Sequence, residues 1–161
     1  MEKKIKKSQE LFSVKDKVII LTGGEGFLGK HYKEFLEGEE ANVVVWDLLG
    51  SPKVDITDEK IVQEAVDEIV RKFGRIDVLI NNAAMNPAVG SEESAKMFVA
   101  ADEYPVDLWS KEIEVNLKGM FICSKAVLPF MKKQKKAVII IISSEVSEIA
   151  HDHRVYADPE K

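Results

Sequence analysis

Three glycines in one short turn are the residues of this sequence best suited to receive a ligand. The segment TGGEGFLG covers residues 22–29 and places Gly23, Gly26 and Gly29 three residues apart. Gly23 lets the chain turn sharply, Gly26 leaves room beside the backbone, and Gly29 lets a following helix pack closely on the preceding strand. Because the first N–H groups of that helix point at the turn, the segment predicts a site for phosphate groups.

An acidic residue follows the glycine turn at a spacing typical of dinucleotide sites. Asp47 ends the apolar segment NVVVWD, where its carboxylate can accept hydrogen bonds from both hydroxyls of an adenosine ribose and repel a 2'-phosphate. The alternative is that Asp47 only forms a turn after a strand. With Phe27 and Leu28 of the glycine turn, these residues predict a binding site for NAD, with NADP disfavoured.

The elements that must hold these residues alternate between apolar runs and helical patterns. Helices are expected directly after the glycine turn, over about 57–73 and over 107–133. This alternation predicts an α/β fold, a Rossmann-type doubly wound parallel sheet with helices on both faces and strand order 3-2-1-4-5. The glycine turn then lies at the carboxyl edge of the sheet, where ligands bind. The five strands are expected at residues 17–22, 42–47, 53–56, 77–84 and 137–144.

Periodicity and capping residues indicate how the first two helices begin, pack and end. Thr57 or Asp58 is expected to cap the second helix and Gly74 to end it. The first helix is expected to bury one apolar stripe, because large side chains recur at every fourth position. The stripe consists of Phe27, Leu28, His31, Tyr32, Phe35 and Leu36.

Length and composition favour one domain, and the motifs above make it a dinucleotide-binding domain over residues 11–161, preceded by a flexible basic tail over 1–10. The 161 residues are 45% hydrophobic and 32% charged, with a formal net charge of −5. The acidic balance argues against a nucleic-acid partner. No apolar run predicts a signal peptide or a membrane span, so a cytoplasmic protein without a membrane partner is expected. The single cysteine, Cys123, is expected to be buried.

Two histidines near the end of the sequence have a spacing that can hold a metal ion. His151 and His153 flank Asp152, but no further cluster of carboxylates or cysteines accompanies them. Metal sites in proteins need three or four such ligands. A solvated loop is therefore expected, and no metal site is predicted.

Four further motifs resemble the short-chain dehydrogenase/reductase family, in the order that the family shows, from about residue 11 to residue 144. They are Asp55-Ile56, NNAA at 81–84, VNLKG at 115–119 and ISS at 142–144. The resemblance implies that the Asp-Ile pair contacts adenine. It also implies that Asn82, Ala83 and Ala84 line the adenosine side of the groove.

The same resemblance implies an activity, hydride transfer between a nicotinamide cofactor and a small alcohol or ketone substrate. In the family a Tyr, a Lys, a Ser and an Asn move the proton. Ser144 matches the Ser that holds the substrate oxygen, and Asn116 matches the Asn that kinks or hydrates its helix. The alternatives are a turn serine and a tolerated polar residue. Because the family associates through its long helices, a homo-oligomer is also implied.

The Tyr and Lys of the family are not matched cleanly. Tyr156 is the only tyrosine after Ser144, but Glu160 stands where the lysine is expected, and Lys161 comes one position late. Pro159 disfavours a helix that would place a Tyr and a Lys on one face. Tyr156 is therefore expected to be a loop residue. The chain is interpreted as truncated, incomplete at its C-terminal end and inactive alone.

Two other functions remain open. The glycine spacing resembles the extended branch of the family, which contains nucleotide-sugar epimerases and dehydratases, whereas NNAA and VNLKG resemble the compact dehydrogenase branch. The third possibility is a dinucleotide-binding module without catalytic activity.

Overall fold

The computed structural model describes residues 12–87, 91–97 and 99–144. In this part of the chain four strands form one parallel sheet in the order β2-β1-β3-β4. The predicted doubly wound parallel sheet is therefore confirmed, with four of the five expected strands in their expected relative order. The strands are β1 (Val18–Thr22), β2 (Asn42–Trp46), β3 (Val78–Asn81) and β4 (Val138–Ile141).

The strand predicted at residues 53–56 is wrong. Val54 donates its N–H to the Asp47 carbonyl oxygen at 2.9 Å, which ties the segment to the end of β2. Asp55 then turns the chain, because its Oδ1 accepts hydrogen bonds from the Thr57 amide at 2.9 Å and from the Thr57 hydroxyl at 2.7 Å. A side chain that bonds the local backbone in this way competes with the ladder of a sheet. The segment is a loop, and β2 is an edge strand of the described sheet.

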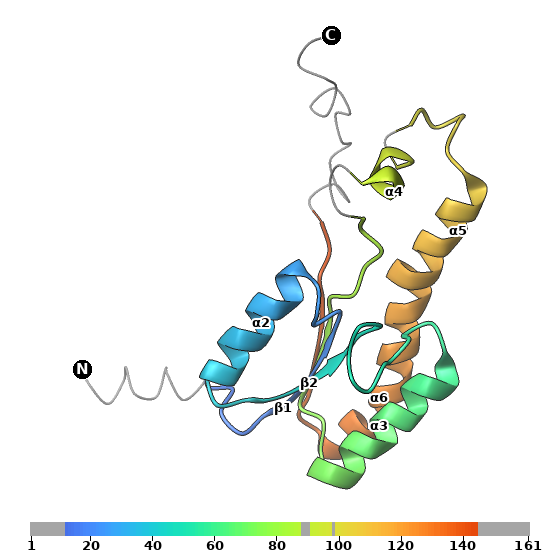
Figure 1. Ribbon diagram of the computed structural model, residues 1–161. Coiled ribbons are helices and arrows are strands. Elements are labelled where there is room, and N and C mark those ends of the chain that lie inside the picture. The colour runs from blue at the N-terminus through green and yellow to red at the C-terminus, as the bar shows by residue number, and fades with distance from the viewer. Residues whose placement is uncertain (1–11, 88–90, 98, 145–161) are drawn as a thin grey trace.

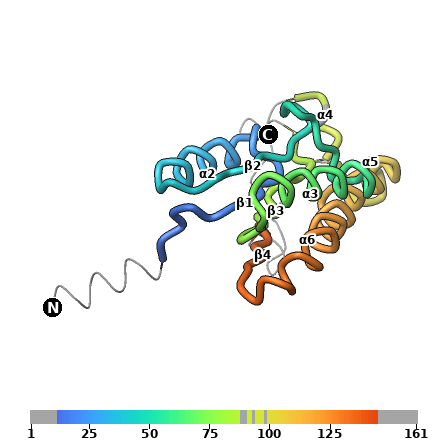
Figure 2. The backbone as a smooth tube through the Cα atoms, turned by 90° about the horizontal axis from the view of Figure 1, so that it is seen from below, coloured from blue at the N-terminus to red at the C-terminus, as the bar shows by residue number. Residues whose placement is uncertain are grey.

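Helices cover both faces of the sheet, as predicted. Helix α2 (Phe27–Gly38) lies on one side of the strands, and α3 (Glu59–Phe73) and α6 (Met120–Gln134) lie on the other (Figure 1). Figure 2 shows the same two layers from below. Right-handed crossovers between successive parallel strands place the helices in this way.

Alternate residues of β1 belong to two separate cores. Ile19 and Leu21 face the small core beneath α2, whereas Val18 and Ile20 face the larger core beneath α3 and α6. All five residues of β1 are buried, as expected for a central parallel strand covered on both faces. Cys123 of α6 lies in the larger core, as predicted, and burial raises the pKa of its thiol to about 12.

Helix α3 begins and ends as the sequence predicts. The Asp58 carboxylate accepts hydrogen bonds from the N–H groups of Lys60, at 2.8 Å, and Ile61, at 3.1 Å. At the other end Gly74 adopts a φ of +70° and donates its N–H to the Val70 carbonyl oxygen at 2.8 Å. Both ends thus satisfy backbone groups that a helix leaves unpaired.

The buried stripe predicted for α2 is largely wrong. Phe27, Leu28, His31 and Phe35 are exposed, and only Tyr32 and Leu36 pack on the sheet. The physical reason is Gly29, the buried residue of this helix. Because Gly29 has no side chain, the first turn of α2 packs directly against the glycine turn. The helix therefore contacts the sheet through residues 29, 32 and 36. The positions at 27, 31 and 35 consequently face away.

The helix predicted over 107–133 is built from three segments. Helix α5 (Val106–Ile113) continues into a π-helical turn, η1 (Glu114–Gly119), and then into α6. The chain between β3 and α5 contains the short helix α4 (Glu92–Ala95). Gly119 permits close packing where η1 crosses the loop after β2, because a Cβ there would lie 2.7 Å from Ile56 Cδ1.

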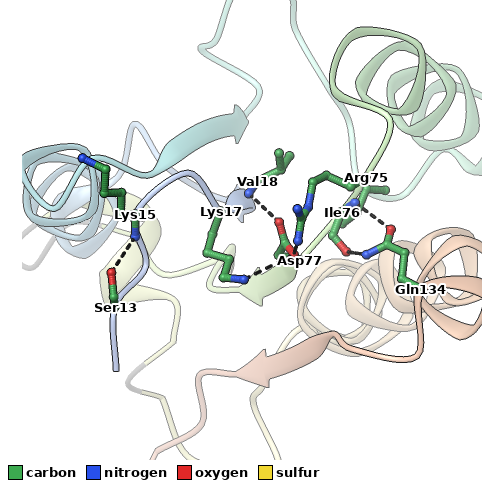
Figure 3. Close-up of polar contacts among 8 residues, drawn as sticks. All are labelled: Ser13, Lys15, Lys17, Val18, Arg75, Ile76, Asp77 and Gln134. Carbon is green, nitrogen blue, oxygen red and sulfur yellow. Dashed lines mark hydrogen bonds and ion pairs between the residues drawn. The ribbon is translucent and has the colours of Figure 1, made fainter. Parts of the chain in front are cut away.

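A buried carboxylate joins the strands at the amino edge of the sheet (Figure 3). Asp77 is 5% exposed, and its Oδ2 accepts a hydrogen bond from the Val18 N–H at 2.9 Å. Its Oδ1 accepts a hydrogen bond from the Arg75 guanidinium and lies 3.9 Å from Lys17 Nζ. Next to it, the Gln134 side chain bonds both the N–H and the carbonyl of Ile76, each at 2.9 Å.

Strand β4 is the other edge of the described sheet and is unusually apolar. Val138, Ile140, Ile141 and Ile142 are all more than a third exposed, although isoleucine runs of this kind are typical of strands that are covered on both faces. None of the helices in the described ranges has the length and apolar character that crossing a bilayer requires.

Candidate dinucleotide site

A cavity of about 710 Å³ opens at the carboxyl edge of the sheet, where doubly wound folds bind ligands. Its volume lies within the range of small-molecule and cofactor sites. Its walls come from the glycine turn and the start of α2 (23–29), the end of β2 (46–49), the loop over 54–57, the segment after β3 (82–86) and Val115. All eleven residues predicted to bind the cofactor line this one cavity.

The glycine turn has the close backbone packing that its sequence predicts. Gly23 has a φ of +67°, and a Cβ there would lie 2.7 Å from the Ala83 Cα. A Cβ on Gly29 would lie 2.1 Å from the Gly23 carbonyl oxygen. Because side chains are excluded at both positions, the turn can lie directly between α2 and β3.

The N-terminus of α2 is open toward the cavity and fits a phosphate group. Gly26 is its N-cap residue and supplies no side chain to cap the first N–H groups, and the first turn contains no acidic residue. A Cβ on Gly26 would meet only the Gly23 carbonyl oxygen, at 3.3 Å. Uncapped N–H groups and the helix dipole favour an anion at this position.

Asp47 stands beside the glycine turn, and its carboxylate is held by backbone N–H groups. Its Oδ2 accepts from Glu25 at 3.0 Å, and its Oδ1 accepts from Leu49 at 2.9 Å. The contact with Leu49 is the turn that the sequence left as the alternative, and the same carboxylate also lines the cavity. Because each carboxylate oxygen has two acceptor positions, Asp47 retains the capacity to accept hydrogen bonds from a ligand.

Asp55 and Ile56 form another part of the cavity wall. Hydrogen bonds from the Thr57 hydroxyl and, to a smaller extent, from the Thr57 amide lower the pKa of the Asp55 carboxyl below its ordinary value. The Ile56 side chain is 7% exposed and belongs to the larger core. One residue therefore presents a fixed carboxylate and the other an apolar surface to the cavity.

The segment after β3 is held to the end of β1 by Thr22. This residue is 1% exposed, and its Oγ1 accepts hydrogen bonds from the N–H groups of Asn82, at 3.0 Å, and Ala83, at 2.9 Å. The Asn82 side chain in turn donates to the carbonyl oxygens of Thr22 and Gly23, at 3.0 and 3.1 Å. The NNAA motif thereby fixes the position of the glycine turn.

Asn116 lies in the π-helical turn η1 and contacts the other end of the same segment. Its Oδ1 accepts a hydrogen bond from the Met85 N–H at 2.7 Å. Turns of π-helix inside longer helices are frequent at functional sites. Asn116 lies within this distorted segment of the helix, and its amide positions the chain that follows the cavity wall.

Neither of the two predicted catalytic residues lines the cavity. Ser144 follows β4 at the carboxyl edge of the sheet, and Asn116 lies in η1. Tyr156, with the lysine at position 161, lies outside the described residues, as do His151 and His153. Within the described ranges no group of three potential metal-binding side chains occurs.

Sequence reasoning missed several residues of the cavity. Glu25 and Thr57 line it directly, and Leu48 and Leu49, which are 53% and 84% exposed, form its rim. The available signal was position, because Glu25 lies in the predicted turn, Leu48 and Leu49 follow the carboxyl end of β2, and Thr57 follows the Asp55-Ile56 motif. The sequence did not indicate that Thr22 holds the segment after β3, because its hydrogen-bond partners are about 60 residues away in the sequence.

A second cavity, of about 790 Å³, lies on the connection before α5. Tyr104 donates a hydrogen bond to the Glu112 carboxylate there at 2.7 Å. Burial of the phenol and the adjacent Glu112 raise the Tyr104 pKa to about 12. At neutral pH this tyrosine is protonated.

Comparison with known proteins gives the family. Residues 50–156 match the short chain dehydrogenase family. The chain is 33% identical over 147 residues to sorbitol-6-phosphate 2-dehydrogenase of Klebsiella pneumoniae, covering 83% of this chain and 54% of that protein. It is 34% identical over 148 residues to the 3-oxoacyl-acyl-carrier-protein reductase of Thermotoga maritima, covering 81% and 56%.

A solved structure agrees with these relatives. ElxO with NADP bound superposes with a TM-score of 0.69 at 25% identity, covering 87% of this chain and 60% of that one. The chain therefore belongs to the short-chain dehydrogenase family, whose cofactor is a nicotinamide dinucleotide, NAD or NADP. It spans about half the length of the curated relatives it matches.

Proposed function

We propose that this chain is the NAD-binding part, over residues 11–161, of an oxidoreductase that transfers hydride between a nicotinamide and a small alcohol or ketone. One observation carries the proposal. The uncapped N-terminus of α2 and the Asp47 carboxylate line the same cavity. One dinucleotide can therefore place its diphosphate at the N-terminus of α2 and its adenosine ribose at Asp47.

NAD is proposed over NADP because of the charge at the ribose end of the cavity. Asp47 accepts hydrogen bonds from hydroxyl groups but repels a 2'-phosphate. Because the solved relative ElxO has NADP bound, membership of the family does not by itself select NAD. The preference is therefore proposed for this chain from its own residues.

Two residues are proposed to act beside the nicotinamide, which when bound accepts or donates the hydride. Ser144 is proposed to hold the substrate oxygen through its hydroxyl. Asn116 is proposed to act by positioning, because its amide holds the Met85 N–H and with it the chain that follows Asn82, Ala83 and Ala84. A proton donor from outside the described residues completes the site.

The remaining proposals concern partners and setting. A small-molecule substrate, a cytoplasmic location and no nucleic-acid or membrane partner are proposed. A homo-oligomer is also proposed, because exposed apolar side chains recur along α5, η1 and α6 at helical spacing. They are Val106, Trp109, Ile113, Leu117, Phe121 and Leu128.

One observation favours a second function. The three glycines are spaced as in the epimerase and dehydratase branch, whose members restore their own NAD after each turnover. Product analysis separates the two, since an epimerase converts its sugar nucleotide without net formation of NADH. A module without catalytic activity would bind the dinucleotide and convert neither substrate class.

Tryptophan fluorescence provides a direct test. The chain contains two tryptophans, of which Trp46 lines the cavity and Trp109 does not. In a Trp109→Phe variant all tryptophan emission comes from Trp46, and saturable quenching by NADH is expected, with reversal by NAD+ at lower concentration than by NADP+. A folded sample without quenching, and without heat of binding in calorimetry, would overturn the proposal.

A further inference from the structure

The second cavity, of about 790 Å³, has no role in the proposed function. Its volume is within the range of small-molecule sites. The described residues that line it come from the chain before α5 and from α5 itself, and none of them lines the dinucleotide cavity. Most of this wall is apolar or aromatic: it contains Met97, Val99, Ala101, Tyr104, Val106 and Trp109.

Glu112 is the only charged side chain among the described residues that line this cavity. It is partly buried, and its Oε2 accepts a hydrogen bond from the Tyr104 hydroxyl at 2.7 Å. Within the described ranges Glu112 forms no ion pair. Because Tyr104 donates its hydroxyl hydrogen to Glu112, the pair offers a ligand acceptor atoms rather than a donor. The apolar wall therefore contains one carboxylate whose charge no described cation compensates.

These features favour a cation over the other small molecules that fit an apolar cavity. A carboxylate forms strong hydrogen bonds with an ammonium group, and the rings of Tyr104 and Trp109 can add cation–π attraction. An anion would be repelled by Glu112. A neutral ligand of the same shape would take water from the carboxylate without compensating its charge, which is unfavourable.

We propose that this cavity binds a small organic ammonium ion with an apolar body. The ammonium group lies at the Glu112 carboxylate, and the apolar part of the ligand packs on the aliphatic and aromatic side chains around it. The inference does not depend on the proposed function, since the two cavities share no described residue.

Three probes of one shape and different charge test the proposal on the full chain by calorimetry. They are phenethylammonium, the neutral 2-phenylethanol and the anion phenylacetate. Phenethylammonium should bind saturably with a dissociation constant of roughly 1 mM or lower. The alcohol should bind at least tenfold more weakly, and the anion should not bind. A low protein concentration keeps self-association through Val106 and Trp109 from covering the cavity. Equal affinity for the cation and the alcohol would overturn the proposal.

A pair of matched variants tests the role of the carboxylate. Glu112→Gln keeps an acceptor for the Tyr104 hydroxyl but removes the charge, and should weaken binding of phenethylammonium roughly tenfold. Glu103→Gln removes the same charge from an exposed position that does not line the cavity, and should bind the probe as the wild type does. An unchanged affinity in folded Glu112→Gln, or an equal loss in Glu103→Gln, overturns the role of Glu112.

NMR locates the bound probe. The chain has two tryptophans, so two indole N–H resonances are expected, and the Trp109→Phe variant assigns them. Saturating phenethylammonium should shift the Trp109 resonance and leave that of Trp46 in place. A shift of Trp46 alone would place the probe in the dinucleotide cavity and overturn the inference. A separate titration with NADH reports on the proposed function, so failure of one does not imply failure of the other.

Discussion

Two aspartates at opposite edges of the sheet show how the same side chain serves structure in one place and a binding site in the other. Asp77 at the amino edge is buried and has a guanidinium, an ammonium and a backbone N–H as partners. Asp47 at the carboxyl edge is partly exposed, and its partners within the described part of the chain are two backbone N–H groups. The first has its charge compensated, whereas the second presents its charge to a cavity.

The difference follows from the topology of a parallel sheet. At the amino edge the strands and the chain that leads into them converge, so polar side chains there can satisfy one another (Figure 3). At the carboxyl edge the chain leaves each strand for a helix on one face or the other, and a gap opens between the connections. Polar groups beside that gap are left with unused hydrogen-bonding capacity.

The largest effect on stability is expected at Asp77. Asp77→Ala leaves the Val18 N–H without its partner and the Arg75 and Lys17 charges without compensation, and should lower the free energy of unfolding by about 3 kcal/mol. Urea denaturation followed by circular dichroism measures the change. Asp77→Asn keeps an acceptor for the Val18 N–H and should lose roughly half as much. An unchanged urea midpoint for Asp77→Ala would contradict the role assigned to this carboxylate.

The next largest effect is expected at Gly29. A methyl group there meets the Gly23 carbonyl oxygen at 2.1 Å, and because that oxygen belongs to the backbone, α2 must move. Gly29→Ala should cost about 2 kcal/mol of unfolding free energy and weaken NADH binding at least tenfold, since the same movement misplaces the N–H groups of α2.

A second glycine of α2 provides the matched control. A Cβ on Gly38 meets nothing within 4 Å, so Gly38→Ala should be neutral or stabilise the chain by about 0.5 kcal/mol, and NADH should bind as to the wild type. If both substitutions have the same effect on binding, the close contact at Gly29 is not what holds the phosphate site together.

The elements of the fold could be predicted because each one has a local cause. The run KVIILT specifies β1, and Asp58 and Gly74 specify the two ends of α3, through contacts within four residues. The predicted strand at 53–56 failed where a local contact of another kind, the Asp55 turn, opposed strand formation. The stripe of α2 failed because Gly29, rather than the large side chains, decides which face meets the sheet.

Many residues of the candidate site could be predicted from the sequence, but the hydrogen bonds that hold them in place could not. Gly23, Asp47 and Asn82 were recognised from motifs, and all three line the cavity. The bonds that hold them, such as those of Thr22 to Asn82 and of Glu25 to Asp47, join strands that are distant in sequence. Pairings of this kind depend on the register of the sheet, which a single sequence does not specify.

Substitution of Asp47 should weaken NADH binding more than it lowers stability, whereas substitution of Asp77 should mainly lower stability. Asp47→Ala removes two hydrogen bonds from a partly exposed position and should lower the free energy of unfolding by only about 1 kcal/mol. Binding of NADH should weaken at least tenfold, because the ribose hydroxyls lose their acceptor. Asp67→Ala, at an exposed position of α3, serves as the control. The contrast between the two edges is wrong if Asp77→Asn weakens NADH binding as much as Asp47→Ala does.

The smallest effect is expected for substitutions of Thr57, which should change the pKa of Asp55, the third acidic residue of the cavity. Its pKa is lowered mainly by the Thr57 hydroxyl, so its contribution to stability is present above the unfolded pKa of about 3.9 and is lost as the pH falls through the lowered folded value. Thr57→Val removes the hydroxyl but keeps the backbone N–H, and the Asp55 pKa should rise part of the way toward its ordinary value. Thr57→Ser keeps the hydroxyl and should keep the pKa low. Carbon NMR of the Asp55 carboxyl measures both, and equal pKa values in the two variants would mean that the amide alone fixes this carboxylate at the cavity wall.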